Sequence, residues 1–150
     1  MVVSDIIPIT GNGLTSTKTE SKYHTNSYCN IVVETHFDAD QSNGVFLTEK
    51  TFKPIKHGQM FFVAGCAGSL QTLRDLGYKT FDHVLDNAYD SETNSTARWQ
   101  KLLAAIQQAK PHLPRLFEQC QDNIEHNQQL FLSKKTDRLN TLLTQLYEHY

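Results

Sequence analysis

The sequence has few cysteines, and their spacing excludes the usual cysteine-based architectures. There are three, Cys29, Cys66 and Cys120, and no two of them form a Cys-x-x-Cys pair. An odd number of widely spaced cysteines argues against a disulfide scaffold and against a zinc ribbon. We therefore expect reduced thiols and a cytoplasmic location.

Long hydrophobic runs are also missing. No stretch approaches the roughly 20 apolar residues that a membrane-spanning helix needs. The residues after Met1 lack a basic region followed by a long apolar run. We accordingly expect neither a signal peptide nor a membrane span.

An excess of positive charge is lacking as well. Fourteen Lys and Arg residues stand against sixteen Asp and Glu, which gives a net charge of -2. Because duplex binding requires a cationic face, this balance argues against nucleic acid as a partner. The hydrophobic fraction of 39% is typical of a globular protein, and 150 residues suit one domain.

Glycine is absent from the second half of the chain, since all seven glycines lie at or before Gly77. Short apolar runs in the first half predict strands over 30–34, 60–64 and 78–81. Helices are predicted between them, over 48–58 and 69–76. Strands that alternate with helices indicate an α/β fold, here a partial Rossmann-like parallel sheet of about three strands.

The glycine-free half is predicted to be helical. Its apolar residues form three stripes that we interpret as core or interhelix contacts. We expect a polar arm or loop over 1–29, the partial Rossmann-like region over 30–98 and a helical C-terminal region over 99–150. The stripes are Trp99, Leu102, Leu103 and Ile106; Leu116, Cys120, Ile124 and Phe131; and Leu139, Leu142, Leu143, Leu146 and Tyr150.

The start of the helix over 48–58 carries the first candidate site. Thr48 is a plausible N-cap, and Gly58 is a plausible end of the helix. Lys50 can pair with phosphate oxygens, and Glu49 can accept hydrogen bonds from both ribose hydroxyls. This combination suits a nucleoside diphosphate. An exposed first turn, in which Glu49 offsets the helix dipole and Lys50 is solvated, explains the same residues.

Two further segments suggest ligands. The turn Gly65–Gly68 between a strand and a helix could cradle phosphate, although tight packing also explains its glycines and the Walker and GxGxxG spacings are missing. Acidic residues and a histidine after the first strand suit a metal ion, but such residues are also common in polar loops. These residues are Glu34, His36, Asp38 and Asp40. The cysteines lack a local motif that would activate a nucleophile.

An ordered set of segments resembles the donor-binding core of glycosyltransferases of the α-1,3-fucosyltransferase type. A hydrophobic strand ends at Glu34 and Thr35, and Phe46-Leu47-Thr48-Glu49-Lys50 follows after a loop. The similarity continues over roughly residues 27–131 and extends to uncharacterised microbial and viral glycosyltransferase-like proteins. Its later segments are Phe61–Gly65, Gly68–Leu70, Leu76–Phe81, Tyr89-Asp90 and Glu125-His126-Asn127.

The resemblance implies a GT-B transferase that uses a nucleotide-sugar donor, such as a GDP-sugar, and needs no metal or other cofactor. By position, Lys50 would bind the diphosphate and Glu49 the ribose, with Phe46 near the base. Glu34, Thr35 and Thr48 would complete the donor-binding set. Thr35 stands where the family usually has Asn, and Phe46 where it usually has Tyr.

A complete enzyme of this type has an acceptor lobe and about six parallel strands in its donor lobe. The catalytic base expected from the family falls in the part that this chain lacks. The chain therefore looks like the C-terminal part of such an enzyme, and its partner could be a separate acceptor lobe or a second copy. The alternative is a non-enzymatic nucleotide-binding or interaction module that docks on another lobe through an unpaired sheet edge.

Overall fold

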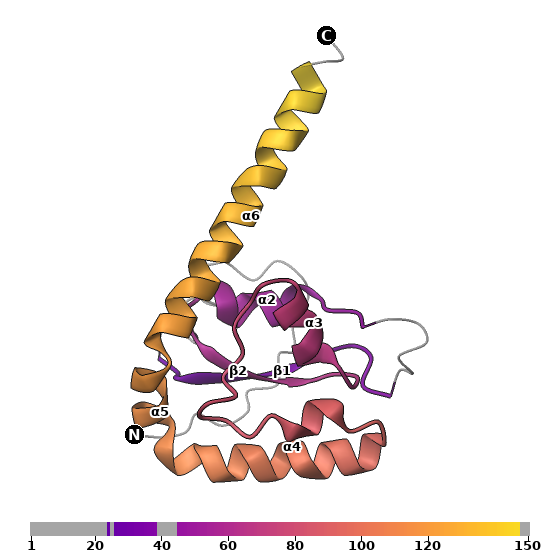
Figure 1. Cartoon of the computed structure of the whole chain (residues 1–150), viewed down its shortest axis with the longest axis vertical. Helices are drawn as coiled ribbons and strands as arrows, with labels where there is room; N and C mark the ends of the chain where they lie inside the picture. The colour runs from indigo at the N-terminus through magenta and orange to yellow at the C-terminus, as the bar shows by residue number, and fades with distance from the viewer. Residues whose placement is uncertain (1–23, 25, 39–44, 148–150) are drawn as a thin grey trace.

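The computed structural model describes residues 24, 26–38 and 45–147. In the described part, a small sheet lies between two layers of helices, with α2 and α3 on one face and α4 on the other (Figure 1). The elements in chain order are β1 (Cys29–Val33), α2 (Glu49–Lys56), β2 (Met60–Ala64), α3 (Ser69–Asp75), the 3-10 turn η2 (Ala88–Ser91), α4 (Ser95–Ala109), the 3-10 turn η3 (Lys110–His112), α5 (Leu113–Gln119) and α6 (Gln121–Tyr147).

The two strands pair in parallel, with Cys29 opposite Met60 and Val33 opposite Ala64. All five residues of β2 are buried, whereas only Val32 of β1 is. Such a continuous apolar run is typical of a parallel strand that is covered on both faces. The predicted α/β class with a parallel sheet is therefore confirmed in outline.

The third predicted strand, over 78–81, is not confirmed, because these residues pair with side chains instead of a strand. The backbone N–H of Lys79 donates to Asn127 Oδ1 (2.7 Å), and Asn127 Nδ2 donates to the Lys79 carbonyl (2.8 Å). Asn123 Nδ2 donates to the Thr80 carbonyl (3.0 Å). Two asparagines of α6 thus satisfy the backbone groups that a neighbouring strand would otherwise bind.

The two predicted helices of the first half are confirmed as α2 and α3. The side chain of Thr48 caps α2 by accepting a hydrogen bond from the backbone N–H of Lys50, as expected of an N-cap. Gly77 follows the end of α3 with a φ of 89°, a conformation that side chains with a Cβ rarely adopt. Local signals were sufficient to place both helices.

The apolar stripe predicted on α4 is only partly correct. Leu102 is buried and Ile106 half-buried, but Trp99 and Leu103 are 43% and 39% exposed. The buried face instead follows Arg98, Leu102, Ala105 and Ala109. The core that this face covers includes Phe61, Phe62, Leu70, Leu73, Phe81 and Tyr89.

Helix α6 begins against the body and then extends beyond it (Figure 1). The second predicted stripe is buried at Leu116, Cys120 and Ile124, with Phe131 partly buried. The side chains of the third stripe, which starts at Leu139, lie outside the described residues, and the backbone of α6 is described as far as Tyr147. Most of the arm predicted over 1–29 also lies outside them.

Candidate functional site

The carboxyl end of β1 meets the N-terminus of α2 through the side chain of Glu34. Glu34 Oε1 accepts hydrogen bonds from the Thr48 N–H (3.0 Å) and from Thr51 Oγ1 (2.5 Å), and Oε2 accepts from Thr48 Oγ1 (2.6 Å). Glu34 is 5% exposed. Its carboxylate therefore fixes the position of the helix start relative to the strand.

The ionisation of Glu34 follows from these contacts. Burial disfavours the carboxylate, but the hydrogen bonds from Thr48 and Thr51 outweigh burial, so the pKa of Glu34 lies below its usual value. The positive charge of Lys50 lowers the pKa of Glu34 further. Glu34 and Thr48, two of the six predicted donor-binding residues, are thus engaged in the internal structure of the site.

Lys50 and Thr35 come together at the surface above this cap. Lys50 Nζ donates to Thr35 Oγ1 (3.3 Å), and both side chains are exposed. Glu49 is also exposed, and no described residue accepts a hydrogen bond from its backbone N–H. The arrangement places an ammonium group, a hydroxyl and a free helix N–H at one strand end, which is suited to an anion.

Phe46 lies at the same end of the sheet with an exposed aromatic ring. It is 62% exposed, and its ring and that of His36 lie in an edge-to-face arrangement with the centroids 6.3 Å apart. His36 is exposed as well. An exposed apolar ring of this kind offers a surface on which a planar base could stack.

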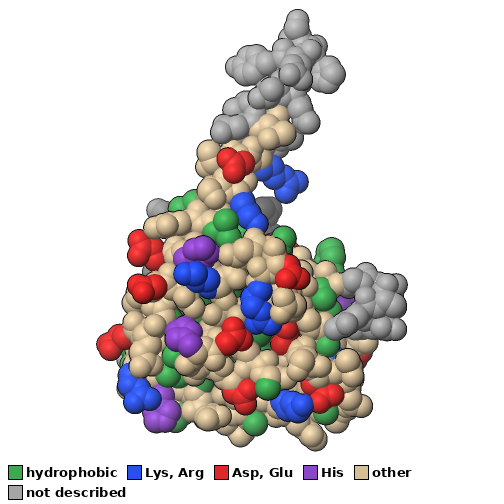
Figure 2. Space-filling model, viewed as in Figure 1, with side chains coloured by type: hydrophobic (Ala, Val, Ile, Leu, Met, Phe, Trp, Pro, Cys, Tyr) green, Lys and Arg blue, Asp and Glu red, His purple; other side chains and the backbone are tan. Residues whose placement is uncertain are grey.

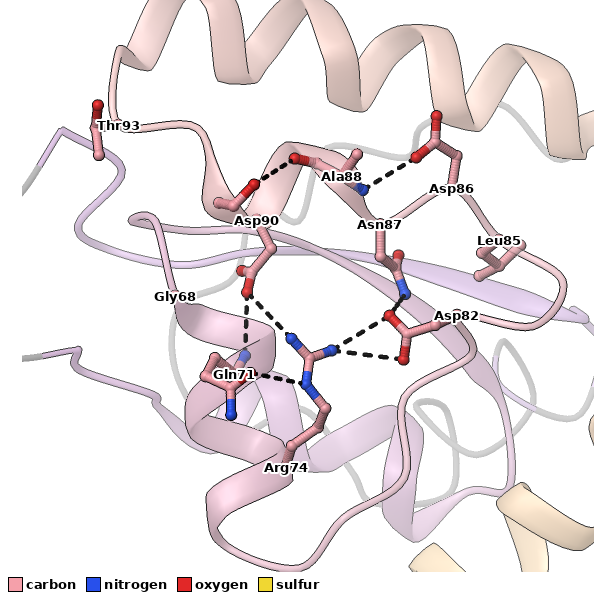
Figure 3. Close-up of a pocket in the computed structure, with 11 residues that line it drawn as sticks. Gly68, Gln71, Arg74, Asp82, Leu85, Asp86, Asn87, Ala88, Asp90 and Thr93 are labelled. Carbon is pink, nitrogen blue, oxygen red and sulfur yellow. Dashed lines mark hydrogen bonds and ion pairs between the residues drawn. The ribbon is translucent and has the colours of Figure 1, made fainter.

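A second candidate lies where β2 leads into α3. An open groove of about 740 Å³ is lined there by Gly68, by residues of α3 and by residues between Asp82 and Thr93 (Figure 3). Its polar centre is Arg74, which contacts Asp82 (3.2 Å) and Asp90 (3.8 Å). None of the six predicted donor-binding residues lines this groove.

Asp90 occupies the start of α3 that the sequence suggested for phosphate. Its carboxylate accepts hydrogen bonds from the N–H groups of Leu70 (2.9 Å) and Gln71 (3.0 Å), and its carbonyl accepts from Gly68 (2.8 Å). Burial raises the pKa of Asp90 despite these bonds. A phosphate at this turn would have to displace a carboxylate, so the turn over 65–68 is a structural connection.

The groove also has the wrong charge for a diphosphate. Asp82, Asp86 and Asp90 line it together with one guanidinium, that of Arg74. Hydrogen bonds from Thr80 and Asn87 and the charge of Arg74 outweigh burial and lower the pKa of Asp82, which favours its carboxylate form. The anion-binding candidate is therefore the end of β1.

Arg98 is the residue at the strand ends that the sequence did not single out. It is 2% exposed, and its guanidinium donates to the carbonyls of Gly65 (3.1 Å), Glu92 (2.7 Å), Thr93 (3.2 Å) and Phe37. It also stacks over the ring of Phe37, 4.5 Å from the centroid. Arg98 thereby connects the loops after both strands to α4. The one sequence signal for this role is the position of Arg98 on a helix face that is otherwise apolar.

No protein-family model matches the chain. No curated protein and no solved structure matches it either. The resemblance to α-1,3-fucosyltransferases therefore depends on the sequence segments alone.

The metal alternative receives no support within the described residues. No cluster of three His, Cys, Asp or Glu side chains among them could hold a metal ion, and Asp40 lies outside them.

Burial raises the pKa of Cys29 to about 12 and that of Cys120 to about 11, which keeps both as thiols. Among the described helices, none combines the length and apolarity that a membrane span requires.

Proposed function

We propose that the chain is the donor-binding part of a glycosyltransferase and binds the nucleoside diphosphate of a nucleotide-sugar at the end of β1. The observation that supports this most directly is the meeting of Lys50 and Thr35 beside the free N–H of Glu49 at the start of α2. A diphosphate placed there receives a charge-assisted hydrogen bond and a helix N-terminal N–H.

The neighbouring side chains suit the rest of a nucleotide. The exposed ring of Phe46 is available for stacking with the base. The exposed carboxylate of Glu49, one residue before Lys50, is available for the ribose hydroxyls. Because neither contact distinguishes one base from another, the proposal covers the diphosphate class and includes GDP-sugars.

The same residues limit the proposal to binding. Glu34, the buried acid nearest to the site, already accepts three hydrogen bonds and has a lowered pKa, so it is a poor general base. One charged hydrogen bond contributes about 1.5–3 kcal/mol. Enzymes lower the barrier by roughly 8–23 kcal/mol, so these contacts favour a donor complex but do not supply catalysis alone.

Calorimetry with GDP and UDP on the full chain tests the proposal. Loss of a charge-assisted hydrogen bond predicts that Lys50→Ala weakens binding by about tenfold or more. Because Lys50 is exposed, the affinity should also fall as salt concentration rises. Lys56→Ala is the matched control, since Lys56 is an exposed lysine in the last turn of the same helix.

Equal affinities of the wild type and Lys50→Ala would remove Lys50 from the site. Absence of binding to either nucleotide would contradict the proposed function as a whole. A sugar-transfer assay with the chain alone separates an enzyme from the second candidate, a non-catalytic module that docks on another lobe.

The free thiols of Cys29, Cys66 and Cys120 support the cytoplasmic location that we propose for either candidate.

A further inference from the structure

The outer edge of β1 carries unpaired backbone groups. Met60 N donates to the Tyr28 carbonyl (3.2 Å) and Glu34 N donates to the Ala64 carbonyl (3.0 Å), so the even-numbered residues of this strand face β2. In a parallel pair the alternate residues point the other way. The N–H and carbonyl groups of Cys29, Ile31 and Val33 therefore face outward, and no backbone hydrogen bond joins them to another described residue.

Apolar side chains lie beside this edge. Ile31 and Val33 are 49% and 60% exposed, and they project from the face opposite Glu34, which is bound to α2. Helix α4 lies on that opposite face (Figure 1) and adds the exposed Trp99 and Leu103. We refer to Ile31, Val33, Trp99 and Leu103 as the β1–α4 patch.

Within β1 itself, the sequence and the pairing lack features that normally prevent association. Exposed edge strands are usually protected by a lysine, a proline or a bulge. Between Cys29 and Val33 there is no charged residue and no proline, and the register with β2 is continuous. An unprotected edge beside an apolar patch is suited to the addition of another strand.

We propose that this edge pairs with the same edge of a second copy of the chain, in an antiparallel arrangement around a two-fold axis at Ile31. In that register Ile31 lies opposite the partner's Ile31, and Cys29 lies opposite the partner's Val33. All three outward-facing residues then exchange backbone hydrogen bonds with a copy of the same set. The donor and acceptor rows are self-complementary, as a two-fold interface requires.

The geometry of the helices fits the same arrangement. A two-fold axis perpendicular to the sheet gives the strand order β2, β1, the partner's β1 and the partner's β2. Both copies of α4 then lie on one face of the four-stranded sheet. The exposed Ile31 and Val33 of both copies then lie on the face of the sheet that carries the two α4 helices.

Sedimentation equilibrium of the full chain tests this proposal. We expect a dimer, and Ile31→Lys should raise its dissociation constant by about tenfold or more by placing charge at the centre of the interface. Leu132→Lys is the control, because Leu132 is 58% exposed on α6, away from the patch. A monomer at all concentrations, or a dimer that only Leu132→Lys disrupts, would overturn the proposal.

Disulfide crosslinking gives a second test that does not depend on the folding of Ile31→Lys. Residues that exchange backbone hydrogen bonds across antiparallel strands have Cα atoms about 5.5 Å apart, within the range of a disulfide. Oxidised Ile31→Cys should therefore run as a covalent dimer on a non-reducing gel, and Leu132→Cys and the wild type should not. Equal crosslinking in Ile31→Cys and Leu132→Cys would contradict the register.

Discussion

The carboxylate of Glu34 holds the start of α2 through hydrogen bonds from Thr48 and Thr51. Since its folded-state pKa is lowered, its ionisation stabilises the fold above the unfolded-state pKa of about 4.3. That contribution is lost as pH falls through the folded-state pKa. The residue therefore links the geometry of the candidate site to acid stability.

Replacing Glu34 by Gln should reveal this dependence. We expect Glu34→Gln to lower the free energy of unfolding by about 1–3 kcal/mol at pH 7, because two hydroxyls and an N–H lose a charged acceptor. The difference from wild type should shrink as pH falls towards 3. Urea unfolding at several pH values measures it. Glu49→Gln, an exposed neighbour, is the control, and a pH-independent difference would contradict the assignment.

Arg98 is the second residue whose loss should be costly. Arg98→Lys keeps the charge but cannot reach the carbonyls of Gly65, Phe37 and Glu92 together, because an ammonium lacks the planar fork. Leaving buried carbonyls unsatisfied predicts a loss of about 2–4 kcal/mol in thermal or urea unfolding. The exposed Arg115→Lys is the matched control, and equal stability of the two variants would refute this role.

Among the elements, the segment over 77–81 depends on α6 for its backbone partners. Asn127 is 2% exposed and binds both backbone groups of Lys79. Its removal leaves the partly buried N–H and carbonyl of Lys79 without these partners, so Asn127→Ala should destabilise the fold by about 1–3 kcal/mol. Hydrogen exchange at the Lys79 amide should accelerate in parallel.

Asn123→Ala provides a graded comparison for this prediction. Asn123 gives one hydrogen bond, to the Thr80 carbonyl, so its loss should cost only about 0.5–1.5 kcal/mol. A larger effect at Asn123 than at Asn127 would show that the paired asparagine contact is not what holds the segment.

These elements also show where sequence reasoning succeeded. The cap at Thr48 and the strand over 60–64 depend on neighbouring residues, and both were predicted. The third strand was wrong because the partner of Lys79 lies 48 residues away on α6. Trp99 and Leu103 were expected to form core or interhelix contacts because they belong to the apolar pattern of α4. That expectation was wrong for the core because the buried face of α4 includes an arginine, Arg98, which an apolar pattern does not reveal.

The candidate site was predictable to a similar extent. The motif placed Lys50 at the start of a helix after a strand, and the structure brings Lys50 to Thr35. The roles of Glu34 and Asp90 as caps could not be read locally, because their partners are 14 to 20 residues away. Nothing in the spacing of Gly65–Gly68 shows that Asp90 takes its N–H groups.

At the scale of the whole molecule, two buried acids and a buried arginine organise the carboxyl ends of a two-stranded sheet. Glu34 fixes α2, Asp90 fixes α3, and Arg98 fixes the loops after both strands. On the face shown in Figure 2, acidic and basic side chains of the described residues are interspersed and form no cationic strip. The end of β1 is thus a local anion-binding candidate on a surface of mixed charge.

Amide chemical-shift mapping of the full chain during titration with GDP tests this placement most directly. We expect concentration-dependent shifts at Thr35 and over 46–50, and their loss in Lys50→Ala but not in Lys56→Ala. Shifts confined to Gln71, Arg74 and Asp82 would place the ligand in the acidic groove and contradict the account. The absence of any shift would contradict nucleotide binding itself.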